Sequence, residues 1–302
     1  MSMAFTIDPD LLGLEDAVAL VTGAGHGIAR GCALQLAKAG CHVAVIDIDS
    51  DNGRSTVKEV EAIGRRAVFI EADVLDPAGV QQMVQETVRA LGSLDVACNV
   101  VGNPGHPPLP ILDLDLDTWN ATVHRNLGTA FLGTKEEAQA MIERQIPGRI
   151  VNVASSSGIV GAPNVADYGA ANAGVIHFTK SAAMELARYG IRVNCIVPGT
   201  HSRPPVPGAP PPTPAMAQFR RMAEQAPPIR RLGDPYETGG LAVFMASKLS
   251  GYMTGHAVYS DGGVVHTTAR PPVGMTMIPN AISGLEWVRE LHEREATEGG
   301  AR

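Results

Sequence analysis

The amino-acid sequence predicts a single-domain α/β fold, in which a doubly wound parallel sheet carries helices on both faces. Short apolar runs rich in β-branched residues alternate along the chain with longer segments of helical periodicity, without hairpin turns between them. The short runs are almost continuously apolar, which is typical of strands covered on both faces. Such alternation builds right-handed crossovers, which place a parallel sheet between two helical layers.

The expected strands share an apolar, β-branched composition, as in AVALV and HVAVI. They cover residues 17–21, 42–46, 67–70, 94–98, 149–154, 191–196 and 257–260. The expected helices alternate with the strands, and several of them end at a glycine, a frequent helix terminator. They cover residues 27–39, 52–63, 78–91, 117–143, 167–189 and 235–245.

A proline-rich segment interrupts the alternation. Residues 203–214 (RPPVPGAPPPTP) hold too many prolines for the interior of a helix or strand, and a helical piece follows at 215–225. A long connection at the carboxyl edge of an α/β sheet often covers the substrate. We expect a substrate lid over about residues 200–230, with a solvated connection as the alternative.

The domain itself is expected to span residues 15–263, after an N-terminal extension at 1–14. A tail follows at 264–302, and its pattern predicts a helix over 284–297. A surface appendage, a contact with a partner subunit and a support for the lid are the interpretations of this tail.

Charge and composition argue against nucleic-acid and membrane partners. The formal net charge is −7 and the pI is near 5.7, whereas a nucleic-acid interface needs a basic face. No apolar run reaches the roughly 18 residues of a membrane helix, and the acidic N-terminus does not resemble a signal peptide. Cys32, Cys41, Cys98 and Cys195 lie in apolar or helical stretches, without CxxC pairs or nearby histidine clusters. They predict small buried side chains, no metal site and a reducing, cytoplasmic location.

A glycine-rich turn between the first strand and the first helix predicts a nucleotide site. It reads Thr22-Gly23-Ala24-Gly25-His26-Gly27-Ile28. Glycines let the backbone approach a pyrophosphate closely, and the following helix directs free N–H groups and its positive dipole end at the anion. Asp47 ends the second strand about 20 residues later, where a carboxylate accepts hydrogen bonds from the adenosine ribose. Because a carboxylate repels a 2′-phosphate, NAD is the expected cofactor.

Further motifs follow this turn in order. Asp73-Val74, Asn99-Val100-Val101-Gly102 and Pro198-Gly199 each follow an expected strand, and Arg230-Arg231-Leu232-Gly233 precedes Asp261-Gly262-Gly263. Together with the glycine turn, in which Ala29 stands for the usual last glycine, they resemble the short-chain dehydrogenase/reductase family over about residues 15–263. The resemblance implies a Rossmann-type fold with a set of NAD-contacting residues. These are Gly23, Gly25, His26, Gly27, Ile28, Asp47, Ile48, Asp73, Val74, Asn99, Val100, Gly102, Tyr168, Asn172, Pro198, Gly199 and Thr200.

The same resemblance implies catalytic roles for four positions. In the family a tyrosine exchanges a proton with the substrate oxygen, a serine holds that oxygen, and a helix asparagine anchors a relay water. Tyr168, Ser155 and Asn126 stand at these positions, and Ser155 is selected from three adjacent serines by its interval to the tyrosine. A lysine normally follows four residues after the tyrosine, but that position is Asn172.

Asn172 is the main departure from the family pattern. Its amide can hydrogen-bond a ribose hydroxyl but supplies no positive charge. Because an unperturbed tyrosine has a pKa of about 10, Tyr168 is expected to stay protonated near neutrality. This hinders alcohol oxidation more than carbonyl reduction. Lys180 lies about 18 Å further along the helix axis and does not replace the missing charge.

Three functions follow from these residues. The first is an NAD(H)-dependent oxidoreductase that interconverts a hydrophobic secondary alcohol and ketone, with Tyr168 as general acid or base. The second is an NAD-binding protein with impaired redox activity, and the third uses Tyr168 as an acid in a non-redox reaction. The retained Ser155, Tyr168 and Asn126 favour the first, because a binding protein has no physical need of that trio.

The sequence says less about substrate and assembly. The expected pocket is lined by the lid and by residues 103–112 and 158–164, which are mostly apolar, with His106, Asn164 and Arg203 as polar candidates. The family resemblance implies a homodimer or homotetramer formed by the helices that bear Asn126 and Tyr168. Both helices carry small and apolar residues suited to an isologous interface.

Overall fold

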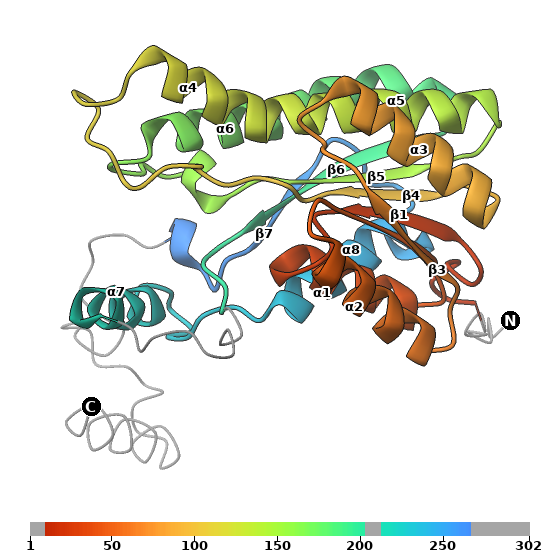
Figure 1. Cartoon of the computed structure of the whole chain (residues 1–302), viewed down its shortest axis with the longest axis horizontal. Coiled ribbons are helices and arrows are strands. Elements are labelled where there is room, and N and C mark those ends of the chain that lie inside the picture. Colours follow the sequence, from red (N-terminus) through yellow and green to blue (C-terminus); the bar gives the residue numbers. More distant parts are fainter. Residues whose placement is uncertain (1–9, 203–212, 267–302) are drawn as a thin grey trace, which may run out of the picture. The chain divides into compact units, whose positions relative to one another are not determined.

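The computed structural model describes residues 10–202 and 213–266, in which seven parallel strands form one sheet (Figure 1). The strand order is β3-β2-β1-β4-β5-β6-β7. The strands are β1 (Val18–Thr22), β2 (His42–Asp47), β3 (Ala67–Glu71), β4 (Val96–Asn99), β5 (Arg149–Val153), β6 (Arg192–Pro198) and β7 (Ala257–Ser260). In register, Leu20 of β1 pairs with Ala44 of β2 and Ala97 of β4. The order reverses between β1 and β4, where open α/β sheets bind ligands.

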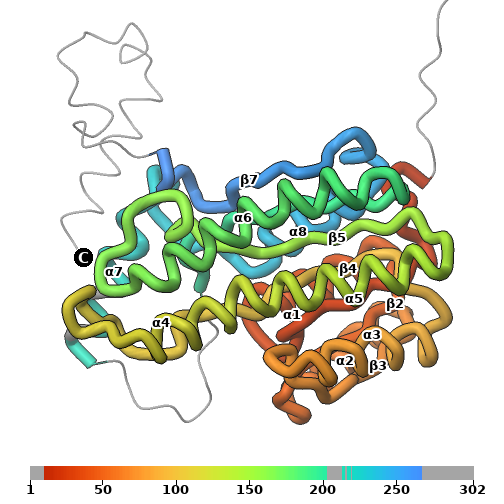
Figure 2. Tube along the Cα trace, turned by 90° about the horizontal axis from the view of Figure 1, so that it is seen from above, coloured from red at the N-terminus to blue at the C-terminus, as the bar shows by residue number. Residues whose placement is uncertain are grey.

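Helices cover both faces of the sheet (Figure 1). One face carries α1 (Gly27–Lys38), α2 (Ser50–Ala62) and α8 (Pro235–Ala246). The other carries α3 (Pro77–Leu91), α4 (Leu116–Val123), α5 (Thr129–Glu143) and α6 (Ala166–Leu186). Seen from above, α4 continues into α5, and both run beside α6 (Figure 2). These layers confirm the doubly wound α/β fold.

Aliphatic cores lie on both faces of the sheet. Buried residues of α1 and α8, such as Leu36 and Met245, fill the core on one face, and Met83 and Met141 belong to a core on the other face. The four cysteines are free and buried, as expected, and burial raises the pKa of the Cys32 thiol to about 12. They therefore act as small core side chains.

The expected strands and helices agree with the structure to within a few residues, with one exception. The segment expected as one helix over 117–143 is interrupted by a π-helical turn at His124–Gly128, between α4 and α5. The helical piece expected at 215–225 is α7 (Pro214–Gln225), which Thr213 caps. Residues 203–212, which make up most of the proline-rich segment (203–214) of the expected lid, and the tail helix expected at 284–297 lie outside the described residues.

The described residues up to Val265 form one compact unit. Leu14, expected at the end of an N-terminal extension, is fully buried and packs into the core beside α1. No helix within the described residues is long and apolar enough to cross a membrane.

Candidate nucleotide and catalytic site

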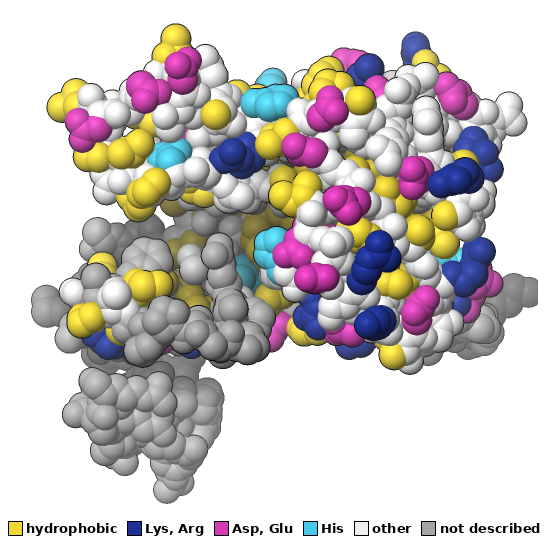
Figure 3. All heavy atoms as spheres, viewed as in Figure 1, with side chains coloured by type: hydrophobic (Ala, Val, Ile, Leu, Met, Phe, Trp, Pro, Cys, Tyr) yellow, Lys and Arg dark blue, Asp and Glu magenta, His cyan; other side chains and the backbone are white. Residues whose placement is uncertain are grey.

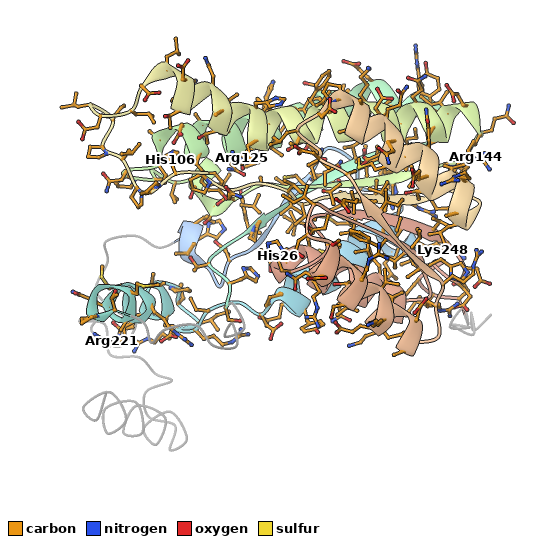
Figure 4. The ribbon with its side chains drawn as sticks, viewed as in Figure 1. His26, His106, Arg125, Arg144, Arg221 and Lys248 are labelled. Atoms are coloured by element: carbon orange, nitrogen blue, oxygen red, sulfur yellow. The ribbon has the colours of Figure 1, made fainter. Side chains whose placement is uncertain are left out.

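The turn from β1 into α1 leaves the first amides of the helix available to a ligand. Gly23 and Gly27 have φ angles of +71° and +56°, which side chains rarely adopt. His26 is the residue before the helix, and its side chain caps none of the helix amides (Figure 4). The N–H groups that a capping side chain usually satisfies therefore point out of the protein, with the positive end of the helix dipole.

Asp47, the expected contact of the adenosine ribose, lies beside this turn. One carboxylate oxygen accepts a hydrogen bond from the Gly25 amide at 2.8 Å, and the other accepts one from the Asp49 amide at 3.0 Å. A Cβ on Gly25 would lie 2.7 Å from the Asp47 carboxylate, so this close approach requires glycine. Each carboxylate oxygen keeps a further lone pair, which a ribose hydroxyl can use.

The ends of β3 and β4 contribute the next predicted positions. The Thr22 hydroxyl accepts a hydrogen bond from the Val100 amide at 3.0 Å, which ties the turn after β4 to the glycine turn. Asp73 is exposed and Val74 is buried beside it. A Cβ on Gly102 would lie 2.5 Å from the Asn126 side-chain oxygen, so this turn packs directly on the helix that carries Asn126.

The turn after β6 is held by β7. The Gly199 amide donates to the Ser260 carbonyl at 3.0 Å, after which Thr200 leads to His201. The sequence analysis did not identify His201 as a residue of the site. Its Nδ1 lies 2.9 Å from the Gly199 carbonyl, and its Nε2 lies 2.8 Å from the Thr238 hydroxyl. Burial lowers the pKa of this imidazole, so His201 supports the predicted NAD-contacting residues Pro198, Gly199 and Thr200 as a neutral ring.

Ser155, Tyr168 and Asn172 come together at the carboxyl edge of β5. Ser155 begins a short 3-10 turn (Ser156–Gly158), and its hydroxyl accepts from the Ser157 amide at 3.2 Å. Tyr168 lies in the first turn of α6. Burial raises the pKa of its hydroxyl, and hydrogen bonds with Ser155 and Asn172 oppose that rise. Both residues therefore lie close enough to Tyr168 to influence its hydroxyl.

Asn172 is buried and turned toward its own helix. Its amide nitrogen donates to the Tyr168 carbonyl at 2.9 Å. Among the described residues, no charged group contributes to the pKa of Tyr168, and Lys180 is not one of its neighbours. The proton is therefore held on Tyr168 by burial, without a cation to release it.

Asn126 occupies the π-helical turn, where a π-bulge often marks a functional site. Its side-chain nitrogen donates to the Thr122 carbonyl at 2.8 Å and to the Asn103 carbonyl at 3.0 Å. The side chain thus joins the end of α4 to the segment that follows β4.

Two buried acids were missed by the sequence reasoning. Glu137 of α5 is fully buried, and one of its oxygens accepts from the Asn99 side chain at 3.0 Å while the other has no partner. Asp167, directly before Tyr168, is also fully buried and binds His106 at 2.8 Å. The only signal in the sequence was a charge on the inward face of a helix, which is rare unless the charge is paired or neutralised.

The predicted substrate loops carry exposed apolar side chains. Ile111, Leu112 and Leu116 are exposed on one loop and the start of α4, and Ile159 and Val160 on another. The space-filling view shows hydrophobic side chains gathered around the start of α4 and the loop that leads into it (Figure 3). No cluster of metal ligands occurs among the described residues.

A separate cavity of about 330 Å³ opens at the carboxyl ends of β6 and β7. Thr200, Arg231 and Asp261 line it, whereas Ser155 and Tyr168 do not. The cavity adjoins Thr200 of the predicted NAD-contacting residues rather than the tyrosine.

Known proteins show the same organisation along nearly the whole chain. The family described as enoyl-(acyl carrier protein) reductase matches residues 23–265. A cyclohexanol dehydrogenase from Rhodococcus sp. (strain TK6) is 36% identical over 279 residues, covering 85% of this chain and 99% of that protein. An L-rhamnose 1-dehydrogenase (NAD(P)(+)) from Sphingomonas sp. (strain SKA58) is 36% identical over 257 residues, covering 83% and 97%.

A solved structure extends the likeness to three dimensions. It is a 7α-hydroxysteroid dehydrogenase complexed with NADH and 7-oxo glycochenodeoxycholic acid, with a TM-score of 0.76 and 27% identity. The match covers 85% of this chain and 98% of the other. The two relatives and this solved structure are named as dehydrogenases, and the solved structure contains NADH. The chain belongs to the short-chain dehydrogenase/reductase family.

Proposed function

We propose that the protein is an NAD(H)-dependent oxidoreductase that interconverts a hydrophobic secondary alcohol and its ketone. The observation that carries this proposal is the grouping of Ser155, Tyr168 and Asn172, from the end of β5 and the start of α6, at the carboxyl edge of the sheet. That edge also holds the uncapped start of α1, where a pyrophosphate fits. Binding and chemistry therefore meet at one edge.

The glycine turn and Asp47 fit a dinucleotide and favour NAD. The gap in front of Gly25 is too small for a Cβ, and the buried Asp47 carboxylate faces it. A 2′-phosphate beside this carboxylate would bring like charges together, whereas ribose hydroxyls can donate to it. When bound, the nicotinamide ring gives or accepts the hydride.

The chain's own residues handle the oxygen and its proton. The Ser155 hydroxyl holds the substrate oxygen, while Tyr168 gives a proton to that oxygen in ketone reduction or takes one in alcohol oxidation. The proposed ribose contact of Asn172 replaces the charge-bearing lysine of the family. Asn126 holds the π-helical turn through which a relay water would reach Tyr168.

The exposed side chains favour an apolar ring as the substrate. Ile111, Leu112, Ile159 and Val160 suit a hydrocarbon ring better than a sugar, so the cyclohexanol and steroid relatives are closer guides than the rhamnose relative. For assembly we propose a cytoplasmic homo-oligomer, dimer or tetramer, through α5 and α6, where Phe131 and Met184 are exposed. Sedimentation as a monomer at micromolar concentration would contradict this assembly.

The impaired alternative rests on Asn172, because no cation lowers the pKa of Tyr168. Turnover of NAD⁺ and NADP⁺ with cyclohexanol and larger ring alcohols tests both functions. We expect NAD⁺ to be preferred, Tyr168→Phe to lose about 10²-fold or more, and Asn172→Lys to increase oxidation at neutral pH by roughly tenfold or more. Ser155→Ala should lose activity, whereas its neighbour Ser157→Ala should keep most of it.

The outcomes separate the two functions. Turnover that survives Tyr168→Phe would overturn the role of the tyrosine. NAD⁺ binding without turnover in the wild type, restored by Asn172→Lys, would establish the NAD-binding function with impaired chemistry.

A further inference from the structure

His106 and Asp167 join the predicted substrate loop to the catalytic helix. Asp167 is the residue before Tyr168, and its side chain is 0% exposed. His106 lies on the loop of residues 103–112, with a side chain 11% exposed, and its Nε2 is 2.8 Å from the Asp167 carboxylate. The sequence separation of 61 residues makes this a tertiary contact between two elements that line the proposed site.

The geometry requires both ring nitrogens of His106 to carry protons. Nδ1 lies 2.6 Å from the Pro107 carbonyl, while Nε2 faces the carboxylate. The Pro107 carbonyl oxygen only accepts hydrogen bonds, as does the carboxylate of Asp167, whose lowered pKa keeps it ionised near neutrality, and a neutral imidazole has a single N–H to donate. Only the imidazolium form satisfies both contacts.

The rest of the loop is held by few polar bonds. The Pro104 carbonyl accepts from the Thr122 hydroxyl at 2.9 Å, and the Leu109 amide donates to the Asn164 carbonyl at 2.8 Å. The His106 ring lies between these two attachments along the chain. If the contact between His106 and Asp167 breaks, the middle of the loop loses this side-chain attachment to α6.

We propose that His106 and Asp167 form a proton-dependent latch, in which the imidazolium holds the substrate loop against the first turn of the catalytic helix. His106 is thus a positioning residue. Loss of its second proton breaks one of the two contacts and loosens the loop. The latch deepens the proposed function, since it sets the substrate wall of the same site.

The surrounding charges agree with this arrangement. Hydrogen bonds with the Pro107 carbonyl and Asp167 raise the pKa of His106, while burial and the nearby Arg125 guanidinium lower it by less. Figure 4 shows His106 and Arg125 side by side below α4. Because the pKa is raised above its ordinary value of 6.5, the latch is complete below that pH and is lost as pH rises through the raised value.

Hydrogen exchange of the Leu109 amide reports on the latch without any need for catalysis. After correction for the intrinsic exchange rate, its protection in the wild type should fall at least roughly tenfold between pH 6 and pH 9, as one charge-assisted hydrogen bond is lost. His106→Gln and Asp167→Asn should show low protection at both pH values, without this dependence. His177→Gln, an exposed histidine of α6, should behave as the wild type.

Activity adds a second measurement. With a substrate that turns over, His106→Gln should raise KM more than it changes kcat, and it should remove the rise of KM with pH. Protection of Leu109 that does not change with pH in the wild type, or that stays pH-dependent in His106→Gln, overturns the latch. If no alcohol turns over, the proposed function fails while the exchange measurement still decides the latch.

Discussion

Replacing Glu137 by glutamine should remove a large pH dependence from the stability of this protein. Glu137 lies on α5 between the helix and the sheet, fully buried, with one oxygen on the Asn99 amide and the other unpartnered. Burial raises the pKa of its carboxyl from 4.5 to about 7, and the hydrogen bond from Asn99 opposes this only in part. The folded state therefore holds a proton that the unfolded chain releases.

The sign and size follow from linkage. A carboxyl with a raised pKa contributes stability that is complete below its unfolded value of 4.5 and is lost as pH rises through about 7. One pKa unit corresponds to about 1.4 kcal/mol, so the free energy of unfolding should lose about 2 to 3 kcal/mol from this group between pH 5 and pH 8.5. Glutamine does not titrate, and its carbonyl can accept the Asn99 hydrogen bond.

Urea unfolding of the wild type and Glu137→Gln at pH 5 and pH 8.5 measures this pH-dependent part of the free energy of unfolding. Subtracting one free energy of unfolding from the other cancels the contributions of the other titrating groups. Between pH 5 and pH 8.5 this difference should shift by about 2 to 3 kcal/mol in favour of the variant. Glu143→Gln, at the exposed end of the same helix, is the matched control and should show no such shift. A wild-type minus variant difference that stays constant from pH 5 to pH 8.5 would refute the buried proton.

Two further predictions concern packing and hydrogen bonding, both measured by urea unfolding. Gly239→Ala should lower the free energy of unfolding by about 1–3 kcal/mol, because the added Cβ would lie 2.4 Å from the Gly31 carbonyl oxygen. Gly240→Ala should raise it by about 0.5–1 kcal/mol, because a Cβ there meets nothing within 4 Å. Equal effects at the two glycines would show that the close approach of α1 and α8 does not matter. Arg192→Met should lower the free energy of unfolding by about 3 kcal/mol, because the Arg192 guanidinium donates to the carbonyls of Met245, Ser247 and Met253. A decrease below about 1 kcal/mol would mean that water replaces these hydrogen bonds.

Patterns local in sequence predicted the fold and much of the site. The strand and helix periods, the glycine turn and the interval from Ser155 to Tyr168 each depend on neighbouring residues, and the doubly wound topology then brings their strand ends to one edge. The π-helical turn at His124–Gly128 was missed because the helical periodicity continues through it. A local widening of the helix changes no residue type that a sequence pattern detects.

The polar contacts between distant elements were outside the reach of such patterns. His106 meets Asp167 across 61 residues, and Glu137 meets Asn99 across 38 residues. No periodicity links these pairs, and each acid occupies an inward helical position where an apolar side chain is usual. Only the assembled fold shows that one acid contacts a histidine and that burial raises the pKa of the other.

The environment of Tyr168 favours giving a proton over taking one. Burial raises the pKa of its hydroxyl above the ordinary value of 10, and Asn172 contributes a hydrogen bond but no charge. At pH 7 fewer than about one in a thousand such hydroxyls are ionised, so the form that acts as a base in alcohol oxidation is scarce. In ketone reduction the protonated tyrosine is the working form and needs no cation to produce it. We therefore expect the substitution at position 172 to cost little in the reductive direction, and the proposed enzyme to act best there.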